Sequence, residues 1–103
     1  GYSVLDAQVY QTALCGRPEV RDGAVFLYLT NPESNSVWLK VRVLDENGEI
    51  LGESGLLRPG EYVPSVRLGP VPESGASLQL QIMGYEPETY HSAGTVYLSV
   101  VIP

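Results

Sequence analysis

Residues 37–43 read Val-Trp-Leu-Lys-Val-Arg-Val, and this stretch decides the fold. An apolar residue stands at every second position, and the positions between them carry Trp38, Lys40 and Arg42. Successive side chains of a β-strand point to opposite faces of the sheet. The alternation therefore predicts a strand with one buried face and one solvated face.

The same alternation recurs along the chain, in the ranges 24–30, 77–82 and 95–102. Shorter candidate strands fill the gaps, at 50–53, at 61–68 and, toward the N-terminus, at 4–14 and 19–21, with a break at 16–18. Pro64 falls within one of them, and because proline has no N–H to donate, we expect it at a sheet edge or a bulge.

No window shows the spacing of apolar residues that an amphipathic helix requires. About seven short strands separated by turn signals are typical of an antiparallel two-sheet sandwich. The sequence therefore predicts an all-β, immunoglobulin-like sandwich that forms one domain over residues 1–103.

Three dipeptides predict where the chain turns. Asn47-Gly48 tolerates positive φ at both positions and predicts a two-residue hairpin turn. Pro59-Gly60 predicts a type II turn, because proline fixes the first φ and glycine supplies the positive second one. Asn31-Pro32 marks a third turn, after the strand at 24–30.

The order of these turns resembles a group of small, poorly characterised bacterial cell-surface or lipoprotein domains. The likeness lies in an Asn-Pro-x-x-Asn turn at 31–35 and a Ser-Gly-x-x-x-Pro-Gly turn at 54–60, and it extends over roughly 24–102. The resemblance implies an immunoglobulin-type sandwich exported to the outside of the cell. It implies no particular biochemical activity.

Composition narrows the classes of partner. The 103 residues carry a formal net charge of −6, and the six Lys and Arg are scattered along the sequence. Proteins that bind nucleic acid cluster their cations against phosphate, so we expect no nucleic-acid partner. No apolar run approaches the roughly 18 residues of a membrane-spanning helix, so we expect no membrane insertion by this domain.

The location of the protein is also an expectation from sequence. The first residue is Gly1 rather than methionine, which is consistent with the removal of a signal peptide or anchor. We expect an extracellular or cell-surface location. The single cysteine, Cys15, excludes an intramolecular disulfide and lies in an apolar stretch, where a buried thiol is usual.

The sequence offers little for catalysis. A nucleophilic enzyme needs a nucleophile, a base and a group that orients the base, and the only histidine is His91, with Ser92 beside it and Cys15 far away in sequence. Acidic pairs flank turns, at 45–49 and at 86–88, without signs of a substrate cleft. We expect no enzyme and no cofactor.

Metal binding has equally weak support. The oxygen-rich stretch 45–49 suits calcium by residue type, but a two-residue turn cannot wrap six ligands. One Cys and one His cannot form a structural zinc site. We therefore predict no metal site.

Two regions are candidate binding surfaces. Strict alternation places Trp38 with Lys40 and Arg42 on the solvated face, and Phe26 and Tyr28 would share it if the two strands were neighbours. Alternatively, a bulge turns Trp38 into the core, or the stems of Lys40 and Arg42 cover its ring.

The second candidate is the loop 84–91, which gathers Tyr85, Tyr90 and His91 with two acidic residues. End loops of sandwich domains often form contact surfaces, and tyrosine suits recognition because its ring is rigid and amphipathic. The alternative is an ordinary connection packed by its own aromatic rings.

The leading interpretation is a non-catalytic extracellular module for adhesion, ligand recognition or spacing, with a protein or carbohydrate ligand. A second hypothesis is a structural subunit that polymerises by edge-strand addition, with residues 2–10 as the donated strand. A third, a small hydrolase around His91, depends on that one histidine.

Overall fold

The computed structural model describes residues 2–6, 11–15 and 18–102, and it describes side chains from Pro18 onward. The described residues form antiparallel strands and no helix. The strands are β1 (Tyr2–Asp6), β2 (Gln11–Cys15), β3 (Glu19–Arg21), β4 (Ala24–Thr30), β5 (Trp38–Leu44), β6 (Ile50–Glu53), β7 (Tyr62–Arg67), β8 (Ser77–Tyr85) and β9 (Ser92–Val101).

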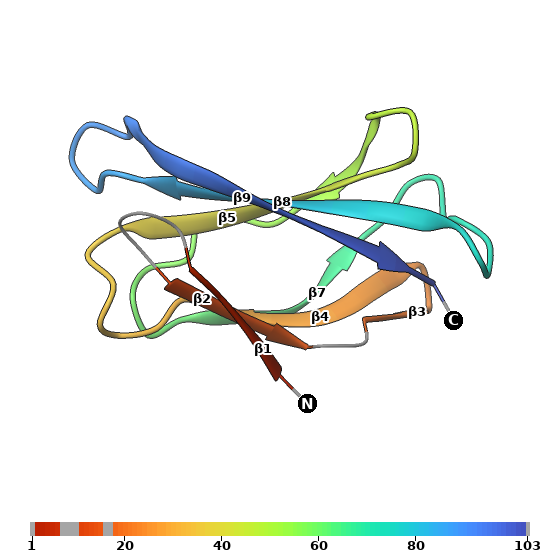
Figure 1. Cartoon of the computed structure of the whole chain (residues 1–103), viewed down its shortest axis with the longest axis horizontal. Coiled ribbons are helices and arrows are strands. Elements are labelled where there is room, and N and C mark those ends of the chain that lie inside the picture. Colours follow the sequence, from red (N-terminus) through yellow and green to blue (C-terminus); the bar gives the residue numbers. More distant parts are fainter. Residues whose placement is uncertain (1, 7–10, 16–17, 103) are drawn as a thin grey trace.

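The strands form two sheets that face each other, as Figure 1 shows, with β9, β8, β5 and β6 in one layer and β1, β2, β4, β7 and β3 in the other. In the first sheet the order is β6-β5-β8-β9. In the second, β1-β2 and the short β3 lie on one side of β4, and β7 pairs with β4 as well. The prediction of an all-β, two-sheet antiparallel sandwich is confirmed.

The prediction for the N-terminal segment is corrected in one respect. One or two short strands are expected over 4–14 and 19–21, but the segment contains three, because β1 and β2 pair with each other, from Tyr2 opposite Cys15 to Asp6 opposite Gln11. Residues 7–10 and 16–17 lie outside the described residues. β2 joins the sheet through Ala13 opposite Thr30, and the predicted strand at 19–21 is confirmed as β3.

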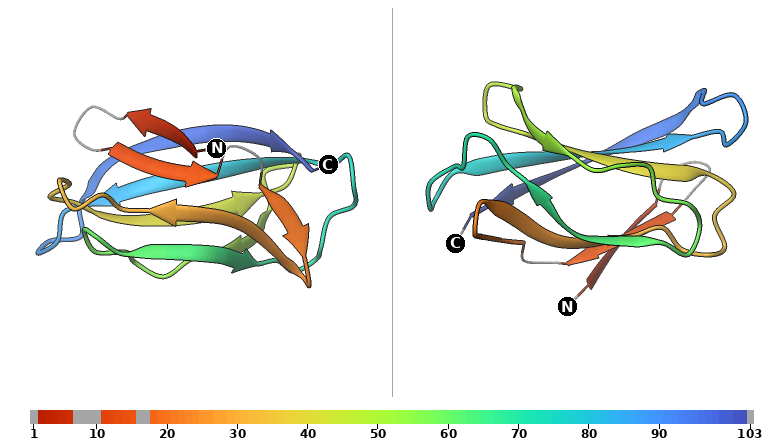
Figure 2. Two further views of the ribbon diagram at one scale, coloured as in Figure 1. Left: turned by 90° about the horizontal axis from the view of Figure 1, so that it is seen from below. Right: turned by 180° about the vertical axis from the view of Figure 1, so that it is seen from behind.

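The apolar side chains on the inner faces of the alternating strands fill the space between the sheets. Eight residues of β4, β5 and β8 are at most 1% exposed: Val25, Leu27, Leu29, Leu39, Val41, Val43, Leu80 and Ile82. Burial of a Leu, Val or Ile side chain contributes about 1.5–3 kcal/mol, so this interior is the main source of stability. The two views of Figure 2 show the two sheets on either side of this interior.

Pro64 lies where its chemistry predicts. β7 pairs only with β4 among the described strands, so it is an edge strand. The register shifts between Phe26 and Leu29, which leaves Leu27 and Tyr28 opposite Pro64 in a bulge. Tyr28 takes a φ of 51° there, a conformation that non-glycine residues seldom adopt.

The predicted type II turn is confirmed, and the predicted two-residue hairpin turn is wrong. In the first, the Glu61 N–H donates to the Arg58 carbonyl, and Gly60 has a φ of 89°. In the second, the Gly48 N–H donates to the Asp45 carbonyl, so the turn begins two residues before Asn47-Gly48. The reason is the Asp45 carboxylate, which accepts the N–H groups of Asn47 and Glu49 at 2.8 and 2.9 Å.

A buried hydrogen-bond network, which we call the Asn31 network, joins the two sheets at one end. The Asn31 side chain is 0% exposed. Its amide donates to the carbonyls of Val37 and Leu57, both at 2.9 Å, and its Oδ1 accepts from the Asn35 amide at 2.7 Å. Its backbone carbonyl accepts the Gly60 N–H. One side chain thereby ties the end of β4 to the segments on both sides of β5.

The segment that follows β6 is held against β5 by similar means. The Ser54 hydroxyl accepts the Val41 N–H at 3.0 Å and donates to the Gly55 carbonyl at 2.8 Å. Leu57 exchanges two backbone hydrogen bonds with Leu39, at 2.7 and 2.9 Å. The chain therefore stays beside β5 as far as the turn at Pro59-Gly60.

The two sheets also approach each other closely at β6 and β7. The Gly69 N–H donates to the Leu51 carbonyl at 2.9 Å, which links the end of one sheet to the edge of the other. A Cβ atom at Gly52 would overlap the carbonyl oxygen of Arg67. Glycine is required at position 52 because backbone occupies the space of its missing side chain.

Candidate functional site

Trp38 lies on the outer face of its sheet, as strict alternation predicted. Leu39, Val41 and Val43 on the opposite side of β5 are 0% exposed, whereas Trp38, Lys40 and Arg42 are half-buried. The alternative that a bulge turns Trp38 into the core is therefore wrong. The large ring covers the first residues of β5 from outside.

The two candidate surfaces predicted from sequence are one surface. Tyr85, at the end of β8, is the cross-strand neighbour of Trp38. The hairpin beyond it folds back, so that the ring of Tyr90 meets the Trp38 ring edge-on, with centroids 5.8 Å apart at 75°. Edge-to-face contacts of this kind are favourable because the positive ring edge meets the negative ring face.

The hairpin between β8 and β9 holds Tyr90 in this position. The Tyr90 N–H donates to the Glu86 carbonyl and the Glu86 N–H donates to the His91 carbonyl, both at 2.8 Å. Tyr90 takes a φ of 58°, which closes the loop. The ring nevertheless remains 54% exposed, so packing against Trp38 leaves most of it open to contact.

Arg58 is a member of this surface that sequence reasoning missed. Its guanidinium lies over the Trp38 ring, 5.3 Å from the centroid, in a cation–π contact. The residue belongs to the turn at 58–61, twenty positions from Trp38 in the chain. Arg58 lies beside Trp38 because Leu57 pairs with Leu39, and no sequence pattern predicted that pairing.

Lys40 and Arg42 share a single carboxylate. Glu53 on the neighbouring β6 accepts from both, with Lys40 Nζ at 3.3 Å and Arg42 Nε at 3.2 Å. The hydrogen bond from Lys40, then the one from Arg42, hold the pKa of Glu53 below its ordinary value of 4.5. By contrast, Arg58 makes no ion pair with any residue that the structure describes.

We call this surface the aromatic–cationic face: Trp38, Lys40, Arg42, Arg58, Tyr85 and Tyr90. It carries half of the six Lys and Arg in an acidic chain, against the one bridging carboxylate of Glu53. The Tyr85 hydroxyl donates a hydrogen bond to the Met83 sulfur at 3.4 Å, next to it on the outer face of β8.

Phe26 and Tyr28 do not belong to this face, because the condition for sharing it, that the two strands be neighbours, is not met. β4 lies in the other sheet, so their rings point out from the opposite side of the sandwich. There they form a separate group, with centroids 6.4 Å apart and the Arg21 guanidinium 4.1 Å from the Phe26 ring. The pairing of β5 with β8 and β6, which excludes β4, is the physical reason.

Of the residues considered for catalysis, the structure describes His91 and Ser92 in full. His91 is exposed in the hairpin loop, and its backbone N–H donates to the Thr89 hydroxyl at 3.4 Å. The Ser92 hydroxyl accepts the Gly94 N–H at 3.4 Å. The side chain of Cys15 lies outside the described residues.

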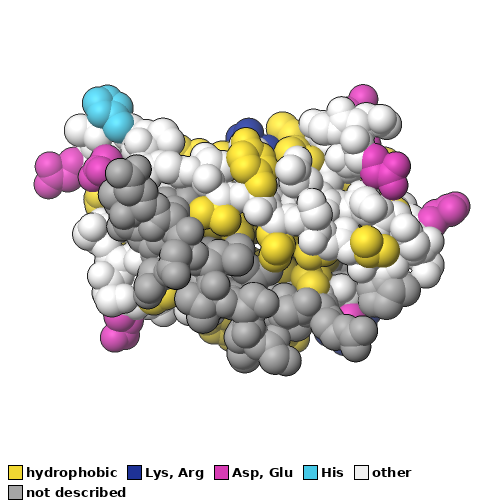
Figure 3. Space-filling view, viewed as in Figure 1, with side chains coloured by type: hydrophobic (Ala, Val, Ile, Leu, Met, Phe, Trp, Pro, Cys, Tyr) yellow, Lys and Arg dark blue, Asp and Glu magenta, His cyan; other side chains and the backbone are white. Residues whose placement is uncertain are grey.

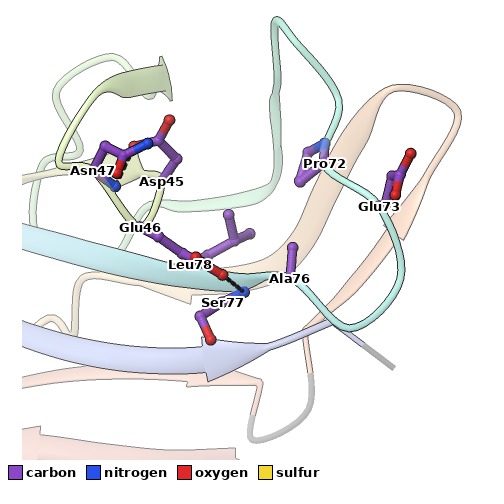
Figure 4. A pocket seen from close by; sticks show the side chains of 8 residues that line it. All are labelled: Asp45, Glu46, Asn47, Pro72, Glu73, Ala76, Ser77 and Leu78. Carbon is purple, nitrogen blue, oxygen red and sulfur yellow. Dashed lines mark hydrogen bonds between the residues drawn. The ribbon is translucent and has the colours of Figure 1, made fainter.

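A shallow hollow of about 310 Å³ lies between the turn at 45–48 and the segment before β8 (Figure 4). Glu46 reaches across to the Ser77 N–H at 3.3 Å, while Glu73 stands apart on the facing loop. The Asp45 carboxylate is occupied by two backbone N–H groups. Among residues 18–102, no group of three His, Cys, Asp or Glu side chains is placed to hold a metal ion.

Comparison with protein-family models, with curated proteins and with solved structures finds no match to this chain. The described part of the chain also contains no helix long and apolar enough to cross a membrane. The function therefore has to be argued from the aromatic–cationic face and from the sequence resemblance.

Proposed function

We propose that this chain is a non-catalytic recognition module of an extracellular or cell-surface protein, and that it binds a protein partner through the aromatic–cationic face. The observation that carries the proposal is the contact of Tyr90 and Arg58 with Trp38. Three segments distant in sequence thereby contribute to one exposed surface. Trp, Tyr and Arg are the residue types that dominate binding energy in protein interfaces.

The chemistry of this face favours a protein over a small ligand. Small ligands bind in concave pockets that bury most of their surface. Here the aromatic rings lie on the outer face of a sheet, and the guanidinium of Arg58 covers one side of the ring that a sugar would stack on. A broad face with aromatic rings, an Arg58 guanidinium without an ion pair among the described residues, and two further cations that share one carboxylate suits a partner with an apolar patch bordered by carboxylates.

The fold supports the proposed type of module. Placing β6-β5-β8-β9 opposite β2-β4-β7 corresponds to the way immunoglobulin-type sandwiches divide their strands between two sheets. The turn sequences that resemble bacterial surface domains occupy buried structural positions, at Asn31, Asn35 and Ser54. We therefore propose an immunoglobulin-like domain of that group, located at the cell surface.

The test is a selection from a phage-displayed random peptide library, run with a glycan array on the same protein. The proposal predicts acidic, aromatic peptides that bind the wild type and lose at least about tenfold in affinity for Trp38→Ala. Phe26→Ala is the matched control, because it removes an aromatic ring under an arginine on the opposite face. Binding unaffected by Trp38→Ala, or glycan binding that alone depends on Trp38, would contradict the proposal.

A second role, as a structural subunit joined by edge-strand addition, is favoured by one observation, the exposed edge of β9. The donor strand expected from sequence, residues 2–10, is less suitable for it. Tyr2–Asp6 already pairs with β2 of the same chain, and 7–10 lie outside the described residues.

A further inference from the structure

Among the described strands, β9 forms an edge of its sheet, and beyond the bulge at its start, next to Gly94, it lacks the charged residues and proline that usually protect such an edge. Among the described strands, β9 pairs only with β8. Edge strands expose unpaired N–H and C=O groups, and proteins commonly protect them with charged residues, proline, bulges or short length. The ten residues of β9 contain no charged side chain and no proline.

The other sheet edges carry the protection that β9 lacks. β6 is four residues long and ends in Glu53. β7 contains Pro64 opposite a bulge and ends in Arg67. β1 ends in Asp6. The contrast within one molecule marks β9 as the edge that is left open to a further strand.

The edge strand β9 is uncharged, whereas the chain as a whole is acidic. The chain has a net charge of −6, so two copies repel each other in most orientations. Figure 3, in which β9 crosses the front of the molecule as in Figure 1, shows acidic side chains at the two ends, and the ten residues of β9 that run between them include no carboxylate. Two copies that meet along β9 therefore avoid placing carboxylates opposite each other.

The sequence of β9 is also compatible with pairing to itself. An antiparallel pair of β9 strands centred on Tyr97 sets Tyr97 against its copy on the outer face, with Thr95 opposite Ser99 on either side. On the inner face it sets Val96 opposite Leu98. Tyr97 is 55% exposed in the single chain, and its hydroxyl accepts a hydrogen bond from Gln81 at 3.0 Å, which fixes the ring on the outer face.

We propose that β9 pairs antiparallel with β9 of a second copy of this chain, which joins the two four-stranded sheets into one continuous sheet across a two-fold axis at Tyr97. Aromatic pairs and hydroxyl pairs across antiparallel strands are stabilising. A two-fold pairing is closed, so it produces a dimer and not a fibre. This inference is independent of the proposed function, because it uses no residue of the aromatic–cationic face.

The test is sedimentation equilibrium of the whole chain from micromolar to millimolar concentration. The proposal predicts a species of twice 11.2 kDa. Tyr97→Lys should raise the dissociation constant of this dimer at least about tenfold, because two ammonium groups would face each other across the axis. The matched control is Gln79→Lys, which adds the same charge to the same face one strand further in and should leave the dimer intact.

The register has a separate test, in a Cys15→Ser background. Tyr97→Cys should form a disulfide-linked dimer under mild oxidation, whereas Ser99→Cys should not, because its cross-axis partner is Thr95. Three results would overturn the proposal: a monomer at every concentration, a dimer that Tyr97→Lys leaves unchanged, or a ladder of higher oligomers. Urea unfolding of each variant shows that the fold is intact, so that loss of the dimer reports on the edge.

Discussion

The Asn31 network and the aromatic–cationic face lie near the same end of the sandwich and use polar chemistry in opposite ways. In the network, the Asn31 side chain is buried, and each of its polar atoms is hydrogen-bonded to a group of the same chain. On the face, Tyr90 is more than half exposed and Arg58 makes no ion pair with a described residue. The polar groups of the Asn31 network are thus satisfied within the chain, whereas the aromatic–cationic face keeps groups that can contact a partner.

The difference leads us to expect that substitutions in the network reduce stability, and that substitutions on the face reduce binding. The largest effect is expected for Asn31→Ala. It removes three buried hydrogen bonds, those to the Val37 carbonyl, to the Leu57 carbonyl (which keeps the Leu39 N–H) and from the Asn35 amide. Each buried polar group left unpaired costs about 1–3 kcal/mol, so we expect a loss of about 3–5 kcal/mol in urea unfolding. Asn47→Ala in the exposed turn is the control, expected to change stability by less than about 0.5 kcal/mol.

Gly52→Ala should follow, with a loss of about 2–4 kcal/mol. The new Cβ would overlap the Arg67 carbonyl oxygen, and backbone on both sides leaves no flexible side chain to yield. Gly55→Ala is the matched control, because an added Cβ there meets nothing within 4 Å. Equal stabilities of the two variants would show that β6 and β7 do not approach as closely as described.

Trp38→Ala should have a smaller effect on stability, a loss of about 1–3 kcal/mol. The variant removes one edge-to-face contact and one cation–π contact, each worth roughly 0.5–1.5 kcal/mol. Urea unfolding beside Asn31→Ala compares the two regions directly. A loss as large as that of Asn31→Ala would place Trp38 among the residues that hold the fold together.

Glu53→Gln should have the smallest effect, under about 1 kcal/mol at neutral pH, because exposed ion pairs are screened by solvent. The pKa of Glu53 is lowered in the folded state, so its ion pairs stabilise the fold above pH 4.5 and are lost as the pH falls through the lowered value. Urea unfolding should therefore show a smaller difference between wild type and variant at pH 3 than at pH 7. Glu73→Gln, which makes the same charge change away from this face, is the control.

The sequence predicted the strands because alternation records which face of a strand is buried. The ranges 24–30 and 50–53 coincide with β4 and β6, and Pro64 was expected at the bulge or edge where it lies. The hairpin turn was predicted one residue too late, with 47–48 and not 46–47 at its centre. The dipeptide Asn47-Gly48 alone does not reveal that the Asp45 carboxylate binds the backbone. Local signals thus located the elements better than the details of their connections.

The composition of the face was harder to predict, because it depends on which strands are neighbours. Alternation placed Trp38, Lys40 and Arg42 together within one strand, but it gave no means of deciding between β4 and β8 as the next strand. Whether Phe26 shares the face of Trp38 therefore stayed open, and Arg58 was overlooked. Contacts between distant segments arise from sheet order, and alternation within a strand carries no information about that order.

The most direct test of the central claim, that Trp38 belongs to an open outer surface and not to the core, is acrylamide quenching of its fluorescence. Trp38 is the only tryptophan, so the signal comes from one side chain. We predict that the native protein is readily quenched and that Arg58→Ala increases the quenching, because the guanidinium covers part of the ring. Emission protected from acrylamide in the native state and released only on unfolding would contradict the account.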